Sequence, residues 1–248
     1  MSTYLIYSLI SVVIVSLLSL VGVFSLSFKI DRLKKFLIYA VSFSAGALLG
    51  DVFVHILPEV AGEFGFGLST SLYILLGIVV MFVVEKVIHW RHCHEPECSN
   101  HKKDVKPFAL MNLVGDGVHN FIDGLIIGAS YLVSIPLGIA TTLAVVFHEI
   151  PQEIGDFGVL VHGGFSRGKA LVFNLVTGLV SVVGVLVVVL VGNVASFVLP
   201  FAVGSFVYIA GVDLMPELHK ERGLGASLGQ LFFFLLGVGI MLILLLVE

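Results

Sequence analysis

The chain has 248 residues, of which 58% are hydrophobic and only 12% are charged, and its formal net charge is −4. A soluble globular domain carries about 25% charged residues, so this composition excludes an ordinary soluble protein. The basic stretches are short and carry no nucleic-acid-binding signature, so we expect no nucleic-acid partner.

Apolar runs of about 20 residues, long enough to cross a bilayer as a helix, recur along the chain. The first run has no basic residue before it and is too long for the apolar core of a signal peptide, so we interpret it as a retained helix. We expect a single all-α membrane domain, residues 1–248, with eight transmembrane helices. Their predicted bounds are Tyr4–Phe28, Phe36–Val60, Leu68–Ile88, Phe108–Leu132, Leu137–Val161, Ala170–Val191, Ser196–Leu218 and Leu224–Val247.

The basic residues predict the orientation of these helices. All 13 lysines and arginines fall in, or at the membrane edge of, the loops that follow predicted helices one, three, five and seven. The positive-inside rule makes these four loops cytoplasmic and leaves both termini outside. The plasma membrane is the default location, and an organelle membrane is the alternative. Because no helix interior holds a Lys or Arg, carboxylates inside the helices must be neutralised by protons or by a bound cation.

Predicted helix two carries Asp51, His55 and Glu59 at intervals of four residues. Side chains at this spacing share one face of an α-helix, and here they climb about 12 Å towards the outside. We interpret them as an acidic entrance to a cation pathway. For Glu59, a solvated helix end is an equally good interpretation.

A faint internal repeat links predicted helices two and seven. A shift of 158 residues aligns Gly46 with Gly204, His55 with Asp213, Pro58 with Pro216, and Glu59 with Glu217. Helix two ends outside and helix seven ends inside, so the repeat is inverted, as in many secondary transporters. We expect helices one to three and six to eight to be related in this way around a central pair, helices four and five.

The largest loop, residues 89–106, is predicted to be cytoplasmic and to be rich in ligands for soft and borderline metals. These ligands are His89, His92, Cys93, His94, Cys98 and His101. Their spacing matches no folded zinc module, so two interpretations stay open: a metal-collecting loop, and a polar loop whose histidines are incidental. The cytosol is reducing, so we expect no structural disulfide between the two cysteines.

The two central helices carry two long polar motifs inside apolar surroundings. Helix four reads Gly-Asp-Gly-Val-His-Asn-Phe-Ile-Asp-Gly over residues 115–124, and helix five reads His-Glu-Ile-Pro-Gln-Glu-Ile-Gly-Asp over residues 148–156. One helical stripe holds His119, Asn120 and Asp123, with Asp116 one turn earlier. The facing stripe holds His148, Glu149, Gln152, Glu153 and Asp156.

Two such stripes can supply imidazole nitrogen and carboxylate oxygen at the distances of about 2.0 to 2.2 Å that zinc requires. Nitrogen and oxygen ligands without thiolate also suit Fe, Mn and Co. A hydrogen bond between helices is the alternative role for Asn120 or Asp116 taken alone. Pro151 frees the backbone carbonyl of Phe147. Glycines of the two helices are expected to let helices approach closely, namely Gly115, Gly117, Gly124, Gly128, Gly155 and Gly158.

These motifs resemble those of the ZIP (Zrt/Irt-like) family of divalent metal transporters. Helix five is similar to the family branch with the motif HExPHExGD, and residues 50–59 of helix two support the same resemblance. The resemblance implies that the protein is a transporter and not an enzyme. The transporter would carry zinc, or else Fe, Mn, Co or Cd, into the cytosol. It also implies that the metal is cargo with no further cofactor, that two rigid units slide past each other, and that the protein is a homodimer.

The resemblance further implies a metal between helices four and five, held by His119, Asp123, His148 and Gln152. A second metal would lie near Asn120 and Glu149, with Asp123 able to bridge. The family branch has His where this chain has Gln152, and an amide is a weaker zinc ligand, so the number of metals stays open. The residues further along the pathway are Asp116, Asp156, Asn174 and Asp213, with Glu217, His162 and His219 at the cytoplasmic side. For Asn174 a structural hydrogen bond is an equal alternative. For His162 and His219 the simpler interpretation is that they are ordinary loop histidines.

An intramembrane zinc hydrolase is the alternative function. The segment from His148 to Gln152 is one residue from the HExxH motif of zinc hydrolases. Gln152 breaks that motif, however, and ligands at several depths suit a pathway better than a single reactive point. A metal sensor without transport is a third hypothesis, although the sequence offers no cytoplasmic domain to relay a signal.

Overall fold

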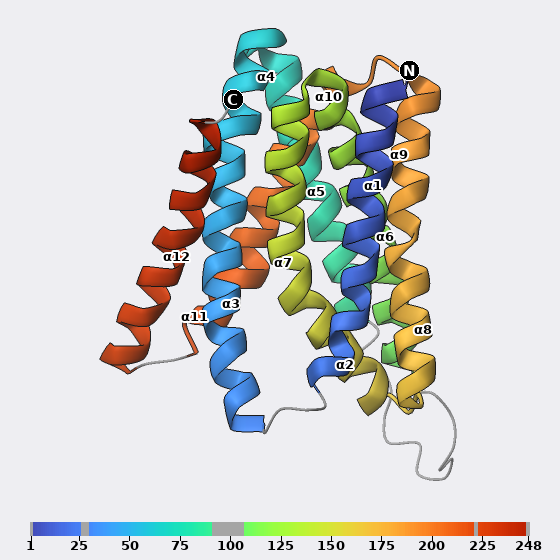
Figure 1. Cartoon of the computed structure of the whole chain (residues 1–248), viewed down its shortest axis with the longest axis vertical. Helices are drawn as coiled ribbons and strands as arrows, with labels where there is room; N and C mark the ends of the chain where they lie inside the picture. Colours follow the sequence, from blue (N-terminus) through green and yellow to red (C-terminus); the bar gives the residue numbers. More distant parts are fainter. Residues whose placement is uncertain (1, 26–29, 91–106, 221–222, 247–248) are drawn as a thin grey trace.

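The protein is a bundle of long helices that run side by side (Figure 1). The computed structural model describes residues 2–25, 30–90, 107–220 and 223–246, and these residues contain no β-strand. The elements are α1 (Ser2–Leu18), η1 (Ser19–Val21), α2 (Gly22–Ser25), α3 (Ile30–Gly50), η2 (Asp51–Ile56), α4 (Leu57–Glu63), α5 (Leu68–Trp90), α6 (Pro107–Val133), α7 (Ile135–His162), α8 (Arg167–Gly178), α9 (Val180–Val191), α10 (Ala195–Tyr208), η4 (Ile209–Leu214), α11 (Met215–Leu218) and α12 (Leu224–Leu245).

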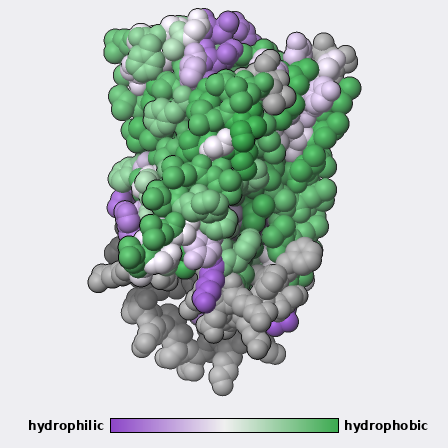
Figure 2. Space-filling view, turned by 60° about the vertical axis from the view of Figure 1, so that its left-hand side comes forward, coloured by the Kyte–Doolittle hydropathy of each residue, from purple (hydrophilic) through white to green (hydrophobic). Residues whose placement is uncertain are grey.

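Six helical stretches among the described residues are long and apolar enough to cross a membrane. They are Thr3–Val21, Lys35–Glu63, Leu68–Lys86, Arg167–Val191, Ala195–Leu218 and Leu224–Leu245. Apolar side chains also cover most of the face that Figure 2 shows, and hydrophilic side chains gather mainly towards its ends. The expected all-α membrane protein is therefore confirmed. The helices α6 and α7 run through the same bundle, but the total of eight membrane-spanning helices stays a prediction.

The two ends of the bundle differ in charge. The N- and C-termini lie at the same end in Figure 1, where α4 also lies. The opposite end holds the start of α3, the end of α5 and the start of α8, with the exposed side chains of Lys35, Lys86 and Arg167. We call this opposite end the basic end.

Two π-helical segments interrupt the helices on either side of the central pair. In η2 the amide of Leu57 donates to the carbonyl of Val52, and next to η4 the amide of Met215 donates to the carbonyl of Ala210. Both hydrogen bonds span five residues instead of the four of an α-helix. The two segments lie at the same shift of 158 residues that aligns the sequence motifs, and each is followed by a proline.

The same shift also relates two close helix contacts. A Cβ atom at Gly46 would overlap the carbonyl oxygen of Phe234 in α12, and one at Gly204 would overlap that of Ile74 in α5. Only glycine permits this approach of one backbone to another. The expected close approach is also confirmed at Gly124, where a Cβ would overlap the carbonyl oxygen of Ser181 in α9. By contrast, Gly155 and Gly158 have open space where a Cβ would stand, so the expectation that these two bring helices together is wrong.

Candidate metal site

Four metal-ligating side chains meet at the centre of the bundle, two from α6 and two from α7. His119 and Asp123 come from α6, and His148 and Glu149 come from α7. The spacing of four residues in α6 places both side chains on one face. All four side chains are buried, and one ligand atom from each lies within 4.8 Å of the others.

The separations between these atoms match those of ligands around one small ion. Nε2 of His119 lies 3.2 Å from Nε2 of His148, 3.3 Å from Oε1 of Glu149 and 3.6 Å from Oδ2 of Asp123. Nε2 of His148 lies 3.2 Å from Oδ2 of Asp123 and 3.8 Å from Oε1 of Glu149. Ligands at about 2.0 to 2.2 Å from a tetrahedral ion stand about 3.3 to 3.6 Å apart, so the four atoms suit zinc geometry.

The chemistry of the cluster also favours a cation. Nδ1 of His148 lies 3.1 Å from the carbonyl oxygen of Ala144, which accepts a hydrogen bond from a protonated Nδ1. The neutral ring then directs the lone pair of Nε2 into the cluster, as in many metal sites. No donor among the described residues makes a hydrogen bond to the carboxylate oxygens of Asp123 or Glu149, although these oxygens are buried. A cation would satisfy both carboxylates.

A break in the backbone of α7 lies inside its motif. Pro151 has no N–H, so the carbonyl of Phe147 loses its helical partner. The hydroxyl of Ser44 in α3 lies 2.5 Å from this carbonyl oxygen and 2.7 Å from that of Ala40, and shares its proton between them. A side chain from a neighbouring helix therefore stabilises the turn from Phe147 to Pro151, which contains His148 and Glu149.

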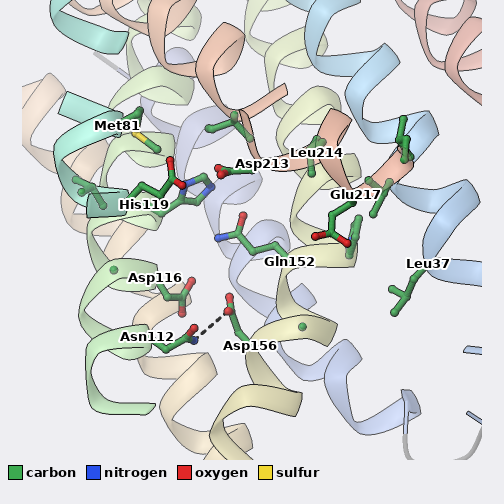
Figure 3. Close-up of a pocket in the computed structure, with 18 of the residues that line it drawn as sticks. Leu37, Met81, Asn112, Asp116, His119, Gln152, Asp156, Asp213, Leu214 and Glu217 are labelled. Atoms are coloured by element: carbon green, nitrogen blue, oxygen red, sulfur yellow. Dashed lines mark hydrogen bonds between the residues drawn. The ribbon is translucent and has the colours of Figure 1, made fainter. Parts of the chain in front are cut away.

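A cavity of about 480 Å³ extends from the cluster towards the basic end (Figure 3). His119 lines it and so belongs to both the cluster and the cavity. Gln152 lies beside His119 on the cavity wall, and its role as a metal ligand stays a prediction. Asp213 and Glu217 also line the cavity and are exposed, so the cavity opens to the surface.

The remaining acids and amides of α6 and α7 form separate pairs. The amide of Asn120 donates to Oδ1 of Asp116 at 2.8 Å, and the amide of Asn112 donates to Oδ1 of Asp156 at 2.9 Å. Neither pair contributes to the group of four. The hydrogen bond that we considered for Asn120 thus exists, but it lies within α6 and does not join two helices.

Glu153 also has its own partners. Its Oε1 accepts a hydrogen bond from the hydroxyl of Ser19 at 2.5 Å, and its Oε2 accepts one from the amide of Asn174 at 2.9 Å. This buried carboxyl thus ties α7 to η1 and α8. The structural alternative for Asn174 is present, although its Oδ1 has no hydrogen-bond partner among the described residues.

The three residues of the expected entrance differ in exposure. Asp51 and His55 are buried, with Oδ1 of Asp51 3.5 Å from Nδ1 of His55. Glu59 is half-buried and lines a second cavity of about 550 Å³, together with Glu63 and residues at the ends of α6 and α9. That cavity lies at the end of the bundle opposite the basic end.

The histidines and cysteines predicted at the cytoplasmic side do not join the group of four or the cavity among the described residues. His89 belongs to the last turn of α5, while His92, Cys93, His94, Cys98 and His101 lie outside the described residues, so the metal-collecting loop stays a prediction. His162 and His219 are exposed at helix ends and do not line the cavity. Sequence reasoning missed Ser19, Ser44 and Asn112, because each acts through a partner on another helix.

Known proteins match this chain along most of its length. The family model described as ZIP zinc transporter matches residues 2–108 and 91–245. A Caenorhabditis briggsae protein, zinc transporter zipt-7.1, is 33% identical over 282 residues, which cover 86% of this chain and 72% of that protein. Human zinc transporter ZIP13 is 32% identical, with 86% of this chain and 70% of that protein covered. Zinc transporter foi of Drosophila melanogaster is 44% identical, but over 56% of this chain and only 20% of its own length. The chain therefore belongs to the ZIP family of zinc transporters.

Proposed function

We propose that this protein carries zinc ions across a membrane into the cytosol through the cluster of His119, Asp123, His148 and Glu149. The observation that carries this proposal is the close approach of four buried nitrogen and oxygen atoms, all within 4.8 Å of one another, inside a membrane bundle. An ionisable group inside a membrane marks an ion pathway more often than a structural contact, because its burial is costly. The names of the relatives, all zinc transporters, support zinc as the cargo.

We infer that the basic end faces the cytosol and that both termini lie outside, since Lys and Arg are enriched in cytoplasmic loops. The position of both termini at one end supports an even number of crossings, and we propose eight, including α6 and α7. The cavity at the basic end then joins the cluster to the cytosol, which corresponds to a state ready to release the ion.

The two π-helical segments support an inverted repeat. Asp51–Ile56 and Ile209–Leu214 are related by the shift that aligns the sequence motifs. The helix that contains the first segment packs on α12, and the helix that contains the second packs on α5. The contact between predicted helices two and eight thus corresponds to the contact between predicted helices seven and three. A repeat of helices one to three in helices six to eight requires this correspondence.

The resemblance to the family supports a homodimer. The helices α5 and α12 expose rows of apolar side chains to the outside of the bundle, and lipid or a second copy can cover these rows. We retain the plasma membrane as the expected location and an organelle membrane as the alternative.

Iron, manganese, cobalt and cadmium are further candidate cargoes, because nitrogen and oxygen ligands bind all of these ions. Gln152 would lower the preference for zinc only if its amide joined the cluster. A second ion near Asn120, Glu149 and Asn174 stays a proposal, supported by Oδ1 atoms of both asparagines that have no hydrogen-bond partner among the described residues.

The hydrolase alternative receives no support. An HExxH site needs two ligands four residues apart on one helix, and in α7 the second position is Gln152. The four clustered side chains instead come two from each helix. Family membership favours transport as well.

Metal uptake tests the proposal. Cells that express the wild type or His119→Ala are offered Zn, Fe, Mn, Co and Cd separately at two pH values. We expect zinc uptake by the wild type and none by the variant, with equal amounts of both proteins in the membrane. Wild-type zinc uptake in His119→Ala would refute the role of the cluster. A correctly inserted wild type that moves no metal would refute transport, and an assay of zinc-dependent hydrolysis by the purified protein would follow.

A further inference from the structure

We propose a second, all-oxygen cation site in the cavity between the central cluster and the basic end, formed by Asp116 and Asp156. This inference rests on the proposed transport of a divalent ion and assigns these two carboxylates to its release. The site would take a partly hydrated divalent cation. It lacks imidazole, so it differs in ligand type from the group of four around His119.

The positions of the two carboxyl groups follow from helix geometry. Asp116 lies three residues before His119 in α6, which corresponds to about 4.5 Å along the helix towards the basic end. Asp156 lies seven residues after Glu149 in α7, which corresponds to about 10 Å along that helix. Because α7 runs in the opposite direction to α6, Asp156 also lies on the basic-end side of the cluster, close to Asn112, one turn beyond Asp116. Both side chains line the cavity, and Figure 3 shows their carboxyl groups turned towards each other.

One buried oxygen of Asp116 lacks a hydrogen-bond partner among the described residues, which indicates that a ligand binds there. The Asp116 side chain is only 4% exposed, and its Oδ2 has no hydrogen-bond partner among the described residues. Its Oδ1 already accepts a hydrogen bond from Asn120, and the side chain of Thr177 in α8 also interacts with this carboxyl group. A second carboxylate, Asp156, interacts electrostatically with it across the cavity. Two facing carboxylates, one of them with a buried free oxygen, are destabilising without a cation or proton between them.

Neutral groups hold the pair in place and complete the ligand set. Asn112 donates to Oδ1 of Asp156 and so leaves the other carboxylate oxygen available to the cavity. Gln152 lies one helical turn before Asp156, and its amide points into the cavity between His119 and the two acids (Figure 3). An ion that leaves His119 would thus meet an amide oxygen and then two carboxylates.

The ligand types suggest why such a site would help release. Oxygen ligands favour hard, hydrated cations, whereas imidazole favours zinc and its neighbours. A zinc ion would therefore bind more weakly at the two acids than at the cluster. Conduction requires sites that bind well enough to receive an ion and weakly enough to let it leave.

Binding of Mn²⁺ to the purified full-length protein tests this site separately from transport. The central cluster is first disabled with the double variant His119→Ala/His148→Ala, and free Mn²⁺ is followed by electron paramagnetic resonance. We expect one Mn²⁺ site to remain. Adding Asp156→Asn or Asp116→Asn should weaken it at least about tenfold, since affinity depends on the number of charged ligands. Asp156→Glu should retain it, and Glu63→Gln, which removes one acid at the far end, should not change it.

Two results would overturn the proposal: no Mn²⁺ site in the double variant, or a site whose affinity for Mn²⁺ does not change when Asp116 or Asp156 is replaced. Zinc binding by Asp156→Asn with the central cluster intact shows whether that variant folds. In the same intact background we expect a lower maximal rate of zinc transport with unchanged zinc affinity of the cluster. A wild type that transports no zinc would refute the proposed function alone, because the Mn²⁺ measurement does not depend on transport.

Discussion

The two sides of the central cluster differ in what separates it from solvent. Towards the basic end, a cavity of about 480 Å³ reaches His119, and exposed acids line its mouth. Towards the other end, the turns of α6 and α7 next to the cluster carry the fully buried apolar side chains of Ile126 and Val145, which belong to the same apolar core as Leu199 of α10. One side therefore offers a cavity lined by acids, whereas on the other side the polar side chains of Asp51 and His55 are buried.

This difference between the two sides is the one expected of a transporter that rests in one of two states. A cation cannot cross several layers of apolar side chains without ligands, because its desolvation costs many kcal/mol. If the proposed orientation holds, we expect α6 and α7 to shift relative to the helices around them when an ion enters from outside. The predicted sliding of two rigid units would accomplish this shift.

Removal of a cluster carboxylate should have the largest effect. Asp123→Asn keeps the size of the side chain but loses its charge, and we expect zinc affinity to fall by more than the 10- to 100-fold typical of outer-sphere changes. Competition with a zinc chelator measures this loss in the purified protein. Asp123→Glu is the matched control and should recover part of the affinity. Equal affinity in wild type and Asp123→Asn would place the zinc elsewhere.

Chemical labelling of cysteines compares the two sides directly. In a background of Cys93→Ser and Cys98→Ser, Gly155→Cys should react quickly with a membrane-impermeant reagent added at the cytosolic side. A side chain fits there, because open space surrounds the position. Leu199→Cys should stay unlabelled from either side, since Leu199 is fully buried. Rapid labelling of Leu199→Cys from outside would contradict the closed side.

Acid should weaken metal binding. Histidine must be neutral and carboxyl groups ionised to act as ligands, so zinc has to displace any protons that they carry. We expect the apparent affinity for zinc to fall steadily as the pH is lowered from about 8 to about 5. Zinc uptake by proteoliposomes over this range measures the effect. Constant affinity would show that proton-binding groups do not hold the ion.

Gln152→His tests whether the side chain at this position on the cavity wall contacts the metal. Imidazole binds zinc more strongly than an amide does, and the variant restores the residue that is usual in this family branch. We expect zinc to bind about tenfold more tightly and to leave more slowly, as multi-site conduction predicts. Binding and transport rate are both measured. Unchanged affinity would show that this side chain contacts no metal.

The smallest effect is expected from Ser44→Ala. This change removes the hydroxyl that donates to the carbonyl of Phe147, which Pro151 leaves without a helical partner. The lost hydrogen bond should lower the free energy of unfolding by about 1 kcal/mol. Thermal unfolding in detergent measures the change, and Ser42→Ala, which loses only a bond within α3, serves as the control. Equal destabilisation by both variants would contradict a special role for Ser44.

The sequence predicted the helices well, because the length of an apolar run alone sets a membrane crossing. The observed bounds of α5 and α9 differ from the predicted ones by a few residues at most at their ends, apart from the break that separates α8 from α9. The stripes of polar side chains on α6 and α7 were also predictable from helical spacing. His119 and Asp123 indeed lie side by side.

Features that depend on partners distant in the sequence were not predictable. The π-helical turns depend on a change of hydrogen bond from four residues to five, which no residue pattern signalled. Membership of the group of four depends on how α6 faces α7, so Glu149 and Gln152 could not be ranked from spacing alone. Ser44 and Asn112 gave no signal, because a lone polar residue in a membrane helix has many roles.

X-ray absorption at the zinc edge tests the central claim most directly, on purified protein loaded with one equivalent of zinc. We expect four nitrogen and oxygen ligands at about 2.0 to 2.2 Å, with the scattering pattern of two imidazole rings that is lost in His119→Ala/His148→Ala. Sulfur at about 2.3 Å, or a spectrum that this double variant leaves unchanged, would contradict it.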